Sequence, residues 1–271
     1  AWEGVYTAKI DGAFGAGTRK SMQAWQEAMG FEPTGTLTST QRAQLLDKVT
    51  AERTALGLAH VADAQADIEI DLPMGLVEFD RYEAPFVRFK AKDGSGVKIL
   101  LISMAGDASV MAGLYDIMQT LEIIPTDGPR TRTDTSFSIE GSSAEIHALT
   151  RVERNGELIK GWTLVTPAAM SAQAQRIASV MEQSFQAGRA HAMDDSIGQP
   201  LAVAPGDLLA GLETRSPAFV RSGFYVSAEG AVVTAAAGMD QCAHVTVEGA
   251  DAKLAVKDAG GLSILTPEGT F

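Results

Sequence analysis

The chain has little cysteine, little histidine and no long apolar run. Among its 271 residues there is one cysteine, Cys242, and there are four histidines. A disulfide bond within the chain is therefore excluded, and cysteine usage does not indicate a redox compartment. The longest strongly apolar runs, such as residues 97–104, fall far short of the about 20 residues that a membrane-spanning helix needs. No transmembrane helix is predicted.

Clusters that bind metals or phosphates are also missing from the sequence. None of His60, His147, His191 and His244 has a second histidine, a cysteine or a carboxylate at a recognised metal-ligand spacing, which zinc sites require. No glycine-rich stretch is followed by the Lys-Ser/Thr pair of a phosphate-binding loop. We therefore predict neither a metal site nor a cofactor.

Positive charge is in deficit. Lys and Arg total 22 against 34 Asp and Glu, so the formal net charge is −12. A surface this acidic repels nucleic-acid phosphates and anionic lipid headgroups, which argues against either as a main partner. The 45% share of apolar residues is that of an ordinary globular protein, and the length suits two or three domains.

Four regions can be distinguished along the chain. Residues 1–50 carry helical patterns, and residues 65–188 alternate between strand and helix patterns. Residues 189–216 are rich in Ala, Gly, Asp and Pro without a clear period, and residues 217–271 are β-like. The sequence therefore predicts a multi-domain α+β protein, with a small helical module, an α+β middle domain, a linker and a partial β-barrel.

Two helices are predicted in the first region. Apolar residues three and four apart predict a helix over residues 18–30, with Thr18 as its N-cap. Thr38, followed three residues later by Gln41, has the capping-box pattern that begins a second helix. Neither Pro nor a glycine cluster interrupts this second helix, so we expect it to continue through residues 52–62.

The middle region predicts an antiparallel sheet with helices on one face. Asn155-Gly156 between two apolar runs is a strong signal for a tight hairpin, because both residues tolerate positive φ. Helices are expected over residues 108–121 and from Pro167 to Phe185. The predicted strands are Ile68–Leu72, Val87–Lys92, Val97–Met104, Thr135–Glu140, Glu145–Glu153 and Leu158–Val165.

The last region predicts a half β-barrel with a hairpin turn at Glu229-Gly230. So short a sheet with open edges is rarely stable by itself. We expect it to pack on the middle domain, to pair with another chain or to continue in a longer protein. Cys242 is expected to be a buried apolar residue, and the alternative is a disulfide with a cysteine beyond the fragment. The predicted strands are Gly223–Val226, Val232–Ala235, His244–Val247, Lys253–Val256 and Leu262–Leu265.

The first region resembles a known family. Residues 11–18 read Asp-Gly-Ala-Phe-Gly-Ala-Gly-Thr, the pair Trp25-Gln26 follows, then Gly30, and residues 34–38 read Thr-Gly-Thr-Leu-Thr. This succession of D-G-x-x-G-x-x-T, aromatic-Gln, Gly and T-G-x-L-T resembles the peptidoglycan-binding domain family over most of the region. The family's usual first helix has no counterpart before Tyr6.

The resemblance implies a peptidoglycan fragment as ligand. Glycan contact needs exposed polar groups and a stacking aromatic, and the candidates are Tyr6, Asp11, Arg19, Trp25 and Gln26. The alternative is that these residues only build the fold. Asp11 can cap a turn through its side chain, and Trp25 lies on the apolar face of the predicted helix. Members of this family also serve as small docking modules without demonstrated affinity for the wall.

Residues 222–237 carry a second resemblance. They read Ser-Gly-Phe-Tyr-Val-Ser-Ala-Glu-Gly-Ala-Val-Val-Thr-Ala-Ala-Ala, which resembles the S-G-F-x-V-x-x-x-G-x-V-L-T-N-A-H run in the first barrel of bacterial trypsin-like serine proteases. The family's general-base histidine corresponds to Ala237, and a looser match places its aspartate at Gly261. Triad chemistry needs a base and a carboxylate that orients it. The resemblance therefore implies an inactive domain without catalytic residues.

These patterns predict a peptidoglycan-associated binding or scaffold protein that carries an inactive trypsin-like domain. The middle region resembles regions found between these two modules in exported alphaproteobacterial proteins, which implies a periplasmic or otherwise exported location. A chain that starts at Ala1 without a methionine fits removal of a signal peptide and fits trimming of the chain equally well. One alternative is a fragment of a serine hydrolase whose noncanonical site is completed beyond residue 271. The other is a subunit of a larger envelope complex that binds a protein partner through the open β edge.

Overall fold

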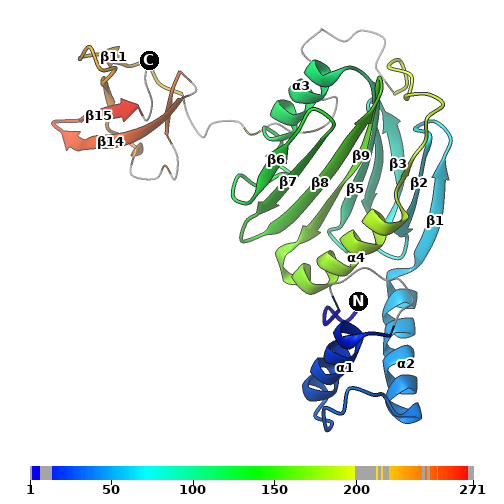
Figure 1. The fold of residues 1–271 in the computed structure, drawn as a ribbon. Helices are drawn as coiled ribbons and strands as arrows, with labels where there is room; N and C mark the ends of the chain where they lie inside the picture. Colours follow the sequence, from blue (N-terminus) through cyan, green and yellow to red (C-terminus); the bar gives the residue numbers. More distant parts are fainter. Residues whose placement is uncertain are drawn as a thin grey trace. The chain divides into compact units, whose positions relative to one another are not determined.

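The computed structural model divides into two compact units, Ala1–Arg215 and Ser216–Phe271 (Figure 1). The first unit holds the predicted helical module together with the α+β region, and the second unit holds the β-like region. The backbone alone is described for residue 250 and for residues 256–259. The structure describes residues 2–6, 14–198, 212, 215, 220–239, 242, 245–248 and 250–267.

Two helices open the first unit, α1 (Ala16–Ala28) and α2 (Ser39–Leu56). Helix α1 begins after Gly15, two residues before the predicted start, so Gly15 is its N-cap and the predicted cap, Thr18, lies within the helix. The capping box that begins α2 is confirmed, because Gln41 N donates to Thr38 Oγ1 at 3.2 Å and Thr38 N donates to Gln41 Oε1 at 3.0 Å.

The end of α2 corrects one expectation. The helix ends at Leu56 and does not continue to residue 62, because Gly57 follows in the left-handed conformation with φ 56°. Gly75 N donates to Leu56 O at 2.9 Å, and a Cβ on Gly57 would lie 2.6 Å from Gly75 N. Only a glycine fits this close approach of two backbones. Strand β1 (Leu58–Asp63) then begins directly.

A seven-stranded antiparallel sheet is the centre of the first unit, and its strands follow the order β3-β4-β5-β9-β8-β7-β6. Strands β8 and β9 form a hairpin in which Asn155 pairs with Leu158 and Gly156 adopts φ 62°, as the Asn-Gly signal predicted. The strands are β3 (Val77–Glu83), β4 (Phe86–Ala91), β5 (Lys98–Ala105), β6 (Arg130–Arg132), β7 (Ser136–Ser142), β8 (Ile146–Asn155) and β9 (Leu158–Pro167).

Smaller elements cover this sheet on both sides. Strands β1, β2 (Ile68–Pro73) and β10 (Gln186–Ala187) form a three-stranded sheet. The helices are α3 (Ala108–Met118), which Asp107 caps, the short 3₁₀ helix η1 (Ala168–Met170) and α4 (Ser171–Ser184).

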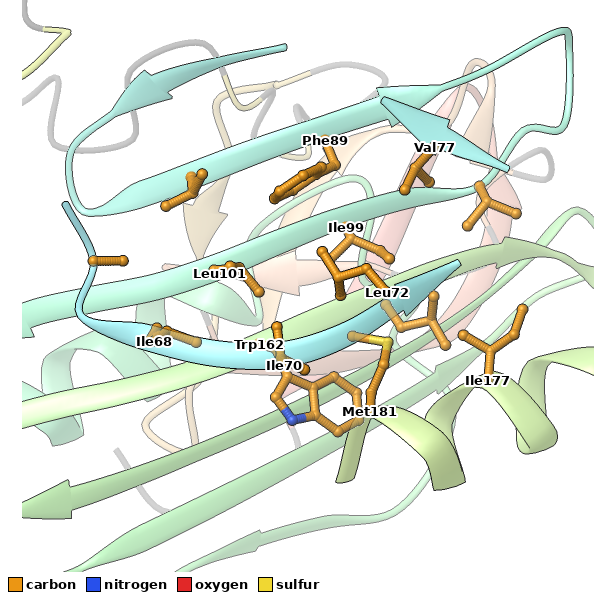
Figure 2. Close-up of a cluster of buried hydrophobic side chains, with 14 of the residues drawn as sticks. Ile68, Ile70, Leu72, Val77, Phe89, Ile99, Leu101, Trp162, Ile177 and Met181 are labelled. Atoms are coloured by element: carbon orange, nitrogen blue, oxygen red, sulfur yellow. The ribbon is translucent and has the colours of Figure 1, made fainter. Parts of the chain in front are cut away.

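Side chains alternate between two apolar cores. On β5, Ile99 and Leu101 enter the core that β2 and α4 cover, whereas Leu100 and Ile102 enter the core under α3. Figure 2 shows the first core, in which Trp162 of β9 lies against residues of β2 and α4. A strand buried on both faces reads as a continuous apolar run, which explains the run at residues 97–104. The predicted fold class is confirmed, and the structure places α3 and α4 on opposite faces.

The helical module is joined to the α+β part by side chains from three segments. Trp2 and Leu56 pack into the core that β2 and α4 cover. Glu52 Oε2 accepts hydrogen bonds from Trp2 Nε1 and from Arg176 Nη1 of α4, both at 2.6 Å. The module and the sheet therefore belong to one compact unit.

The first ten residues of the predicted linker are packed against the first unit. Met193 is buried, Ile197 packs against the core, and Ala84 N donates to Ile197 O at 3.0 Å. Further along, Leu212 packs against the core under α3, and Arg215 N donates to Thr120 O at 2.7 Å. The sequence pattern did not predict these contacts. They consist of backbone hydrogen bonds and of isolated apolar side chains, which produce no period along the chain.

The second unit is a five-stranded antiparallel sheet in the order β11-β12-β15-β14-β13. Its described core consists of Val232, Met239, Val247 and Leu265. Register shifts between Leu254 and Ala259 bend β14. The strands, which correspond to the five predicted ones, are β11 (Phe224–Tyr225), β12 (Val232–Ala235), β13 (Thr246–Val247), β14 (Ala250–Ala259) and β15 (Leu262–Pro267).

A buried lysine ties the two sheets of the first unit together. The Lys160 side chain is 2% exposed, and its Nζ donates to Ala66 O and Asp67 O at 2.8 Å and to Asp67 Oδ2 at 3.0 Å. The hydrogen bond from Lys160 is the main reason that the pKa of the Asp67 carboxyl is lowered. Ser103 Oγ also donates to Ala66 O and accepts from Met193 N. Every hydrogen of the ammonium group therefore has an acceptor, which burial of the charge requires.

Replacement of this lysine is expected to destabilise the first unit. Lys160→Met keeps the apolar stem but removes the buried ammonium, so Asp67 loses its ion pair and two carbonyls each lose one of their two donors. The free energy of unfolding should therefore fall by about 1–3 kcal/mol. Chemical denaturation of the full chain measures the change. The control is Lys90→Met, which removes an exposed lysine from β4 and should change stability by no more than about 0.5 kcal/mol. Equal stability of the two variants would contradict the structural role of Lys160.

Candidate functional site

Gln26 lies at the centre of the helical module. Its side chain is almost fully buried, and its Nε2 lies 3.1 Å from each of Thr34 Oγ1, Thr36 O and Gln41 Oε1. Its Oε1 accepts a hydrogen bond from Gly35 N at 2.8 Å. This single side chain therefore connects α1, the loop at residues 34–36 and the first turn of α2.

The loop approaches α1 closely at Gly35, which has φ 72°. A Cβ at this position would lie 2.5 Å from Arg19 Cγ, so the family-like Thr-Gly-Thr sequence has a steric reason. Trp25 is buried beside Phe31, with ring centroids 5.9 Å apart. The Trp25 Nε1 has no hydrogen-bond partner in the part of the chain that the structure describes.

The five predicted ligand residues occupy different environments. Trp25 and Gln26 are interior residues, Tyr6 is half-buried and Asp11 lies outside the described residues. Arg19 is exposed on α1, and its guanidinium carbon lies 5.7 Å from the centroid of the Phe14 ring. The structure therefore brings Arg19 together with Phe14, which the sequence reasoning did not select. Ligand contact by the five residues stays a prediction.

Removal of the central amide is expected to loosen the module. Gln26→Leu keeps the side-chain volume but leaves Gly35 N without its acceptor, and it should lower the free energy of unfolding by about 1–3 kcal/mol. Hydrogen exchange at the Gly35 amide should accelerate at the same time. Gln44→Leu on the exposed side of α2 is the matched control. Unchanged protection of Gly35 in Gln26→Leu would show that the loop does not depend on this hydrogen bond.

The two protease-like positions lie close together in the second unit. Ala237 is an exposed residue in the turn after β12, and its neighbour Ala236 donates a backbone hydrogen bond to Gly261 O at 2.9 Å. Gly260 and Gly261 form the β14–β15 turn with φ 67° and 86°. This left-handed conformation favours glycine and strains aspartate. Ala237 therefore contributes only a methyl group, and Gly261 contributes no side chain.

A base and an acid at these two positions could be replaced only by other titratable groups of the second unit. Its described residues include no histidine, and His244 lies outside them. Cys242, which was expected to be buried, is half-buried and free, and its Sγ lies 3.7 Å from Gly238 O. The described part of the second unit therefore contains no imidazole to act as a general base.

One serine and one histidine meet in the first unit. His147 Nδ1 lies 2.9 Å from Ser142 Oγ across the β7–β8 hairpin. In a catalytic triad a carboxylate holds the second ring nitrogen, and no ion pair between His147 and a carboxylate is found among the described residues. The geometry is that of a cross-strand polar pair.

A histidine and two carboxylates meet on the β1–β2 hairpin, a cluster that the sequence reasoning missed. His60 Nδ1 lies 3.0 Å from Asp71 Oδ1, and His60 Nε2 lies 3.4 Å from Glu69 Oε2. Ser184 Oγ accepts from Asp71 N and donates to Val180 O, each at 2.8 Å. Because both ring nitrogens of His60 face carboxylates, neither is available to a serine hydroxyl. Glu69 and Asp71 are two residues apart on β2 and therefore lie on one face of the hairpin, opposite His60. This alternation along the strand could have revealed the cluster from the sequence.

This cluster predicts a pH dependence of stability. The hydrogen bond to Asp71 is the main cause that raises the pKa of His60. A raised folded-state pKa adds stability that is fully present below the unfolded value of about 6.5 and is lost as the pH rises through the folded value. His60→Gln should therefore cost more stability at about pH 5.5 than at about pH 9.

Urea midpoints of the wild type and of His60→Gln at both pH values measure this difference. The control is His147→Gln, whose imidazole contacts a hydroxyl group instead of carboxylates. A larger loss for His60→Gln at high pH would reverse the sign and refute the linkage.

Metal centres and membrane-spanning helices are both absent from the part of the chain that the structure describes. Within the described ranges, no group of three or more His, Cys, Asp or Glu residues could hold a metal ion. None of the described helices is long and apolar enough to cross a bilayer.

Comparison with known families identifies the N-terminal region. A family model described as a peptidoglycan binding domain matches residues 1–45, which confirms the first resemblance. No curated protein matches the chain. The trypsin-like resemblance of residues 222–237 stays a prediction.

Two solved structures are similar to part of the chain. A crystal structure from Bacteroides thetaiotaomicron VPI-5482 is 10% identical over 48% of this chain and 48% of its own length, with a TM-score of 0.33. This chain therefore spans about half of that protein. The solution structure of cyanobacterial PsbP (CyanoP) from Synechocystis sp. PCC 6803 is 16% identical over 48% of this chain and 92% of its own length, with a TM-score of 0.34. Neither likeness carries an argument about function.

Proposed function

We propose that this chain is a peptidoglycan-associated binding protein of the cell envelope, exported to the periplasm or beyond, and that it is not an enzyme. The observation that carries the proposal is the peptidoglycan-binding module at residues 1–45. A protein that associates with the wall meets its ligand outside the cytoplasm, which is why export is part of the proposal.

The packing of the module supports a role in positioning the rest of the first unit. Trp2 and Leu56 are anchored in the core of the α+β part, and Glu52 bridges α2 to Arg176 of α4. A module held in this way orients the sheet relative to whatever it binds. A flexible tether would not do so.

The exposed pair of Arg19 and Phe14 is the surface that we propose for ligand contact. Peptidoglycan fragments combine peptide carboxylates with sugar rings. A guanidinium forms paired hydrogen bonds with a carboxylate, and an aromatic ring packs against the apolar face of a sugar. Arg19 and Phe14 supply both groups side by side. Trp25 and Gln26 act indirectly, since they hold the helix and loop that carry this pair.

Charge reversal at Arg19 tests the wall-binding proposal. Arg19→Glu should reduce retention of the full chain on purified peptidoglycan sacculi by about tenfold, because one charged contact is replaced by a repulsive one. Arg42→Glu, which makes the same charge change at an exposed position on α2, is the control. Equal retention of both variants would refute the proposed surface, and a wild-type chain that does not bind sacculi would refute the function.

The proposal that the second unit is an inactive trypsin-like domain rests on Ala237 and Gly261, where the family has its base and its acid. A fluorophosphonate probe, which labels activated serines, is expected to leave the full-length protein unlabelled. Specific labelling that competes with a serine-protease inhibitor would favour the serine hydrolase reading instead.

A further inference from the structure

The guanidinium of Arg19 carries a positive charge that its neighbours do not neutralise. Among the residues that the structure describes, no carboxylate forms an ion pair with Arg19, and no acceptor receives a hydrogen bond from it. Its guanidinium carbon lies 5.7 Å from the centroid of the Phe14 ring, which has no acceptor oxygen and is 56% exposed. The N–H groups of Arg19 are therefore available to a ligand.

The sequence around Arg19 is free of acid. Residues 12–26 contain two cations, Arg19 and Lys20, and neither Asp nor Glu. Arg19 is the fourth residue of α1, whose first turn has no acidic side chain. The helix macrodipole opposes a cation near the N-terminus of a helix. The position of Arg19 therefore works against the stability of α1 and favours an anion that comes from outside the chain.

The loop at residues 34–36 holds the stem of this arginine. A Cβ at Gly35 would lie 2.5 Å from Arg19 Cγ and 3.3 Å from Arg19 O, so the backbone of the loop lies directly against the side chain. Gly35 N in turn donates to Gln26 Oε1 at 2.8 Å. A side chain that is held before binding loses less conformational entropy when the ligand arrives. Arg19 is therefore partly preorganised for its ligand.

The acidic excess of the chain lies outside the helical module. Residues 1–56 contain six Lys and Arg and six Asp and Glu, so the net charge of −12 comes entirely from the residues that follow. Exposed charges separated by more than about 8 Å are largely screened at physiological ionic strength. The surface at Arg19 can therefore attract an anion although the chain as a whole is acidic.

We infer that the surface formed by Arg19 and Phe14 recognises the free carboxylates of peptidoglycan peptides, and that it prefers them to the same groups in amidated form. This inference rests on the proposed function. A guanidinium donates two parallel hydrogen bonds to a carboxylate, and such charge-assisted bonds are about twice as strong as neutral ones. A carboxamide has one acceptor oxygen and no charge. Phe14 contacts the apolar part of either ligand, so the preference comes from Arg19.

Two preparations of purified sacculi that differ only in their carboxylates test this inference. The amines of both preparations are first acetylated, and the carboxylates of one are then converted to carboxamides with a carbodiimide and ammonia. The full chain should bind the carboxylate-bearing sacculi about tenfold more tightly than the amidated ones. Arg19→Gln should bind both preparations equally. Arg42→Gln, the same change at an exposed position on α2, is the matched control and should keep the preference.

The outcomes separate this inference from the proposed function. A wild type that binds neither preparation would refute the function itself. A wild type that binds both equally would leave the function standing and overturn the inference, and an Arg19→Gln variant that keeps the preference would overturn it as well. Arg19→Lys, which keeps the charge without the paired donors, should retain part of the preference. Urea unfolding checks that each variant is folded, and the comparison of the two preparations with the wild type needs no variant.

Discussion

The structure of the first unit depends on a sheet that is apolar on both faces. Strands β5 and β9 send alternate side chains into two cores, and each fully buried aliphatic or aromatic side chain contributes about 1.5–3 kcal/mol. Water must therefore be excluded from both sides. Helix α3 covers one face, and the other is covered by β2 and α4, which in turn receive Trp2 and Leu56 from the helical module. The position of the module is thus a consequence of how the sheet is covered.

Backbone carbonyls at the edges of the two cores are also buried, so they need hydrogen-bond donors. Lys160 and Ser103 both donate to Ala66 O at the β1–β2 turn, where the backbone would otherwise leave acceptors unsatisfied. A buried ion pair of this kind adds specificity of position more than net stability. It fixes the small sheet against the large one, and the segment at residues 188–193 is hydrogen bonded to the same turn.

The two family-like regions differ in what their motif residues do. In the helical module, the aromatic-Gln pair is interior, and the surface that it supports carries Arg19 and Phe14. In the second unit, Ala237 and Gly261, which the trypsin-like prediction matches to a base and an acid, lie in two turns that the hydrogen bond from Ala236 N to Gly261 O joins. The motif of the first region therefore supports the fold of the module, whereas the trypsin-like resemblance of the second unit stays a prediction.

Patterns local in sequence determined most elements of this protein. The apolar stripe of α3, the capping box at Thr38 and the turn at Gly156 were predictable because each depends on residues a few positions apart. The same holds for the absence of an imidazole at Ala237. Only the tertiary structure decided the end of α2 at Gly57 and the burial of Lys160. Each of these depends on backbones or side chains brought together from distant segments, and no periodicity along the chain records such contacts.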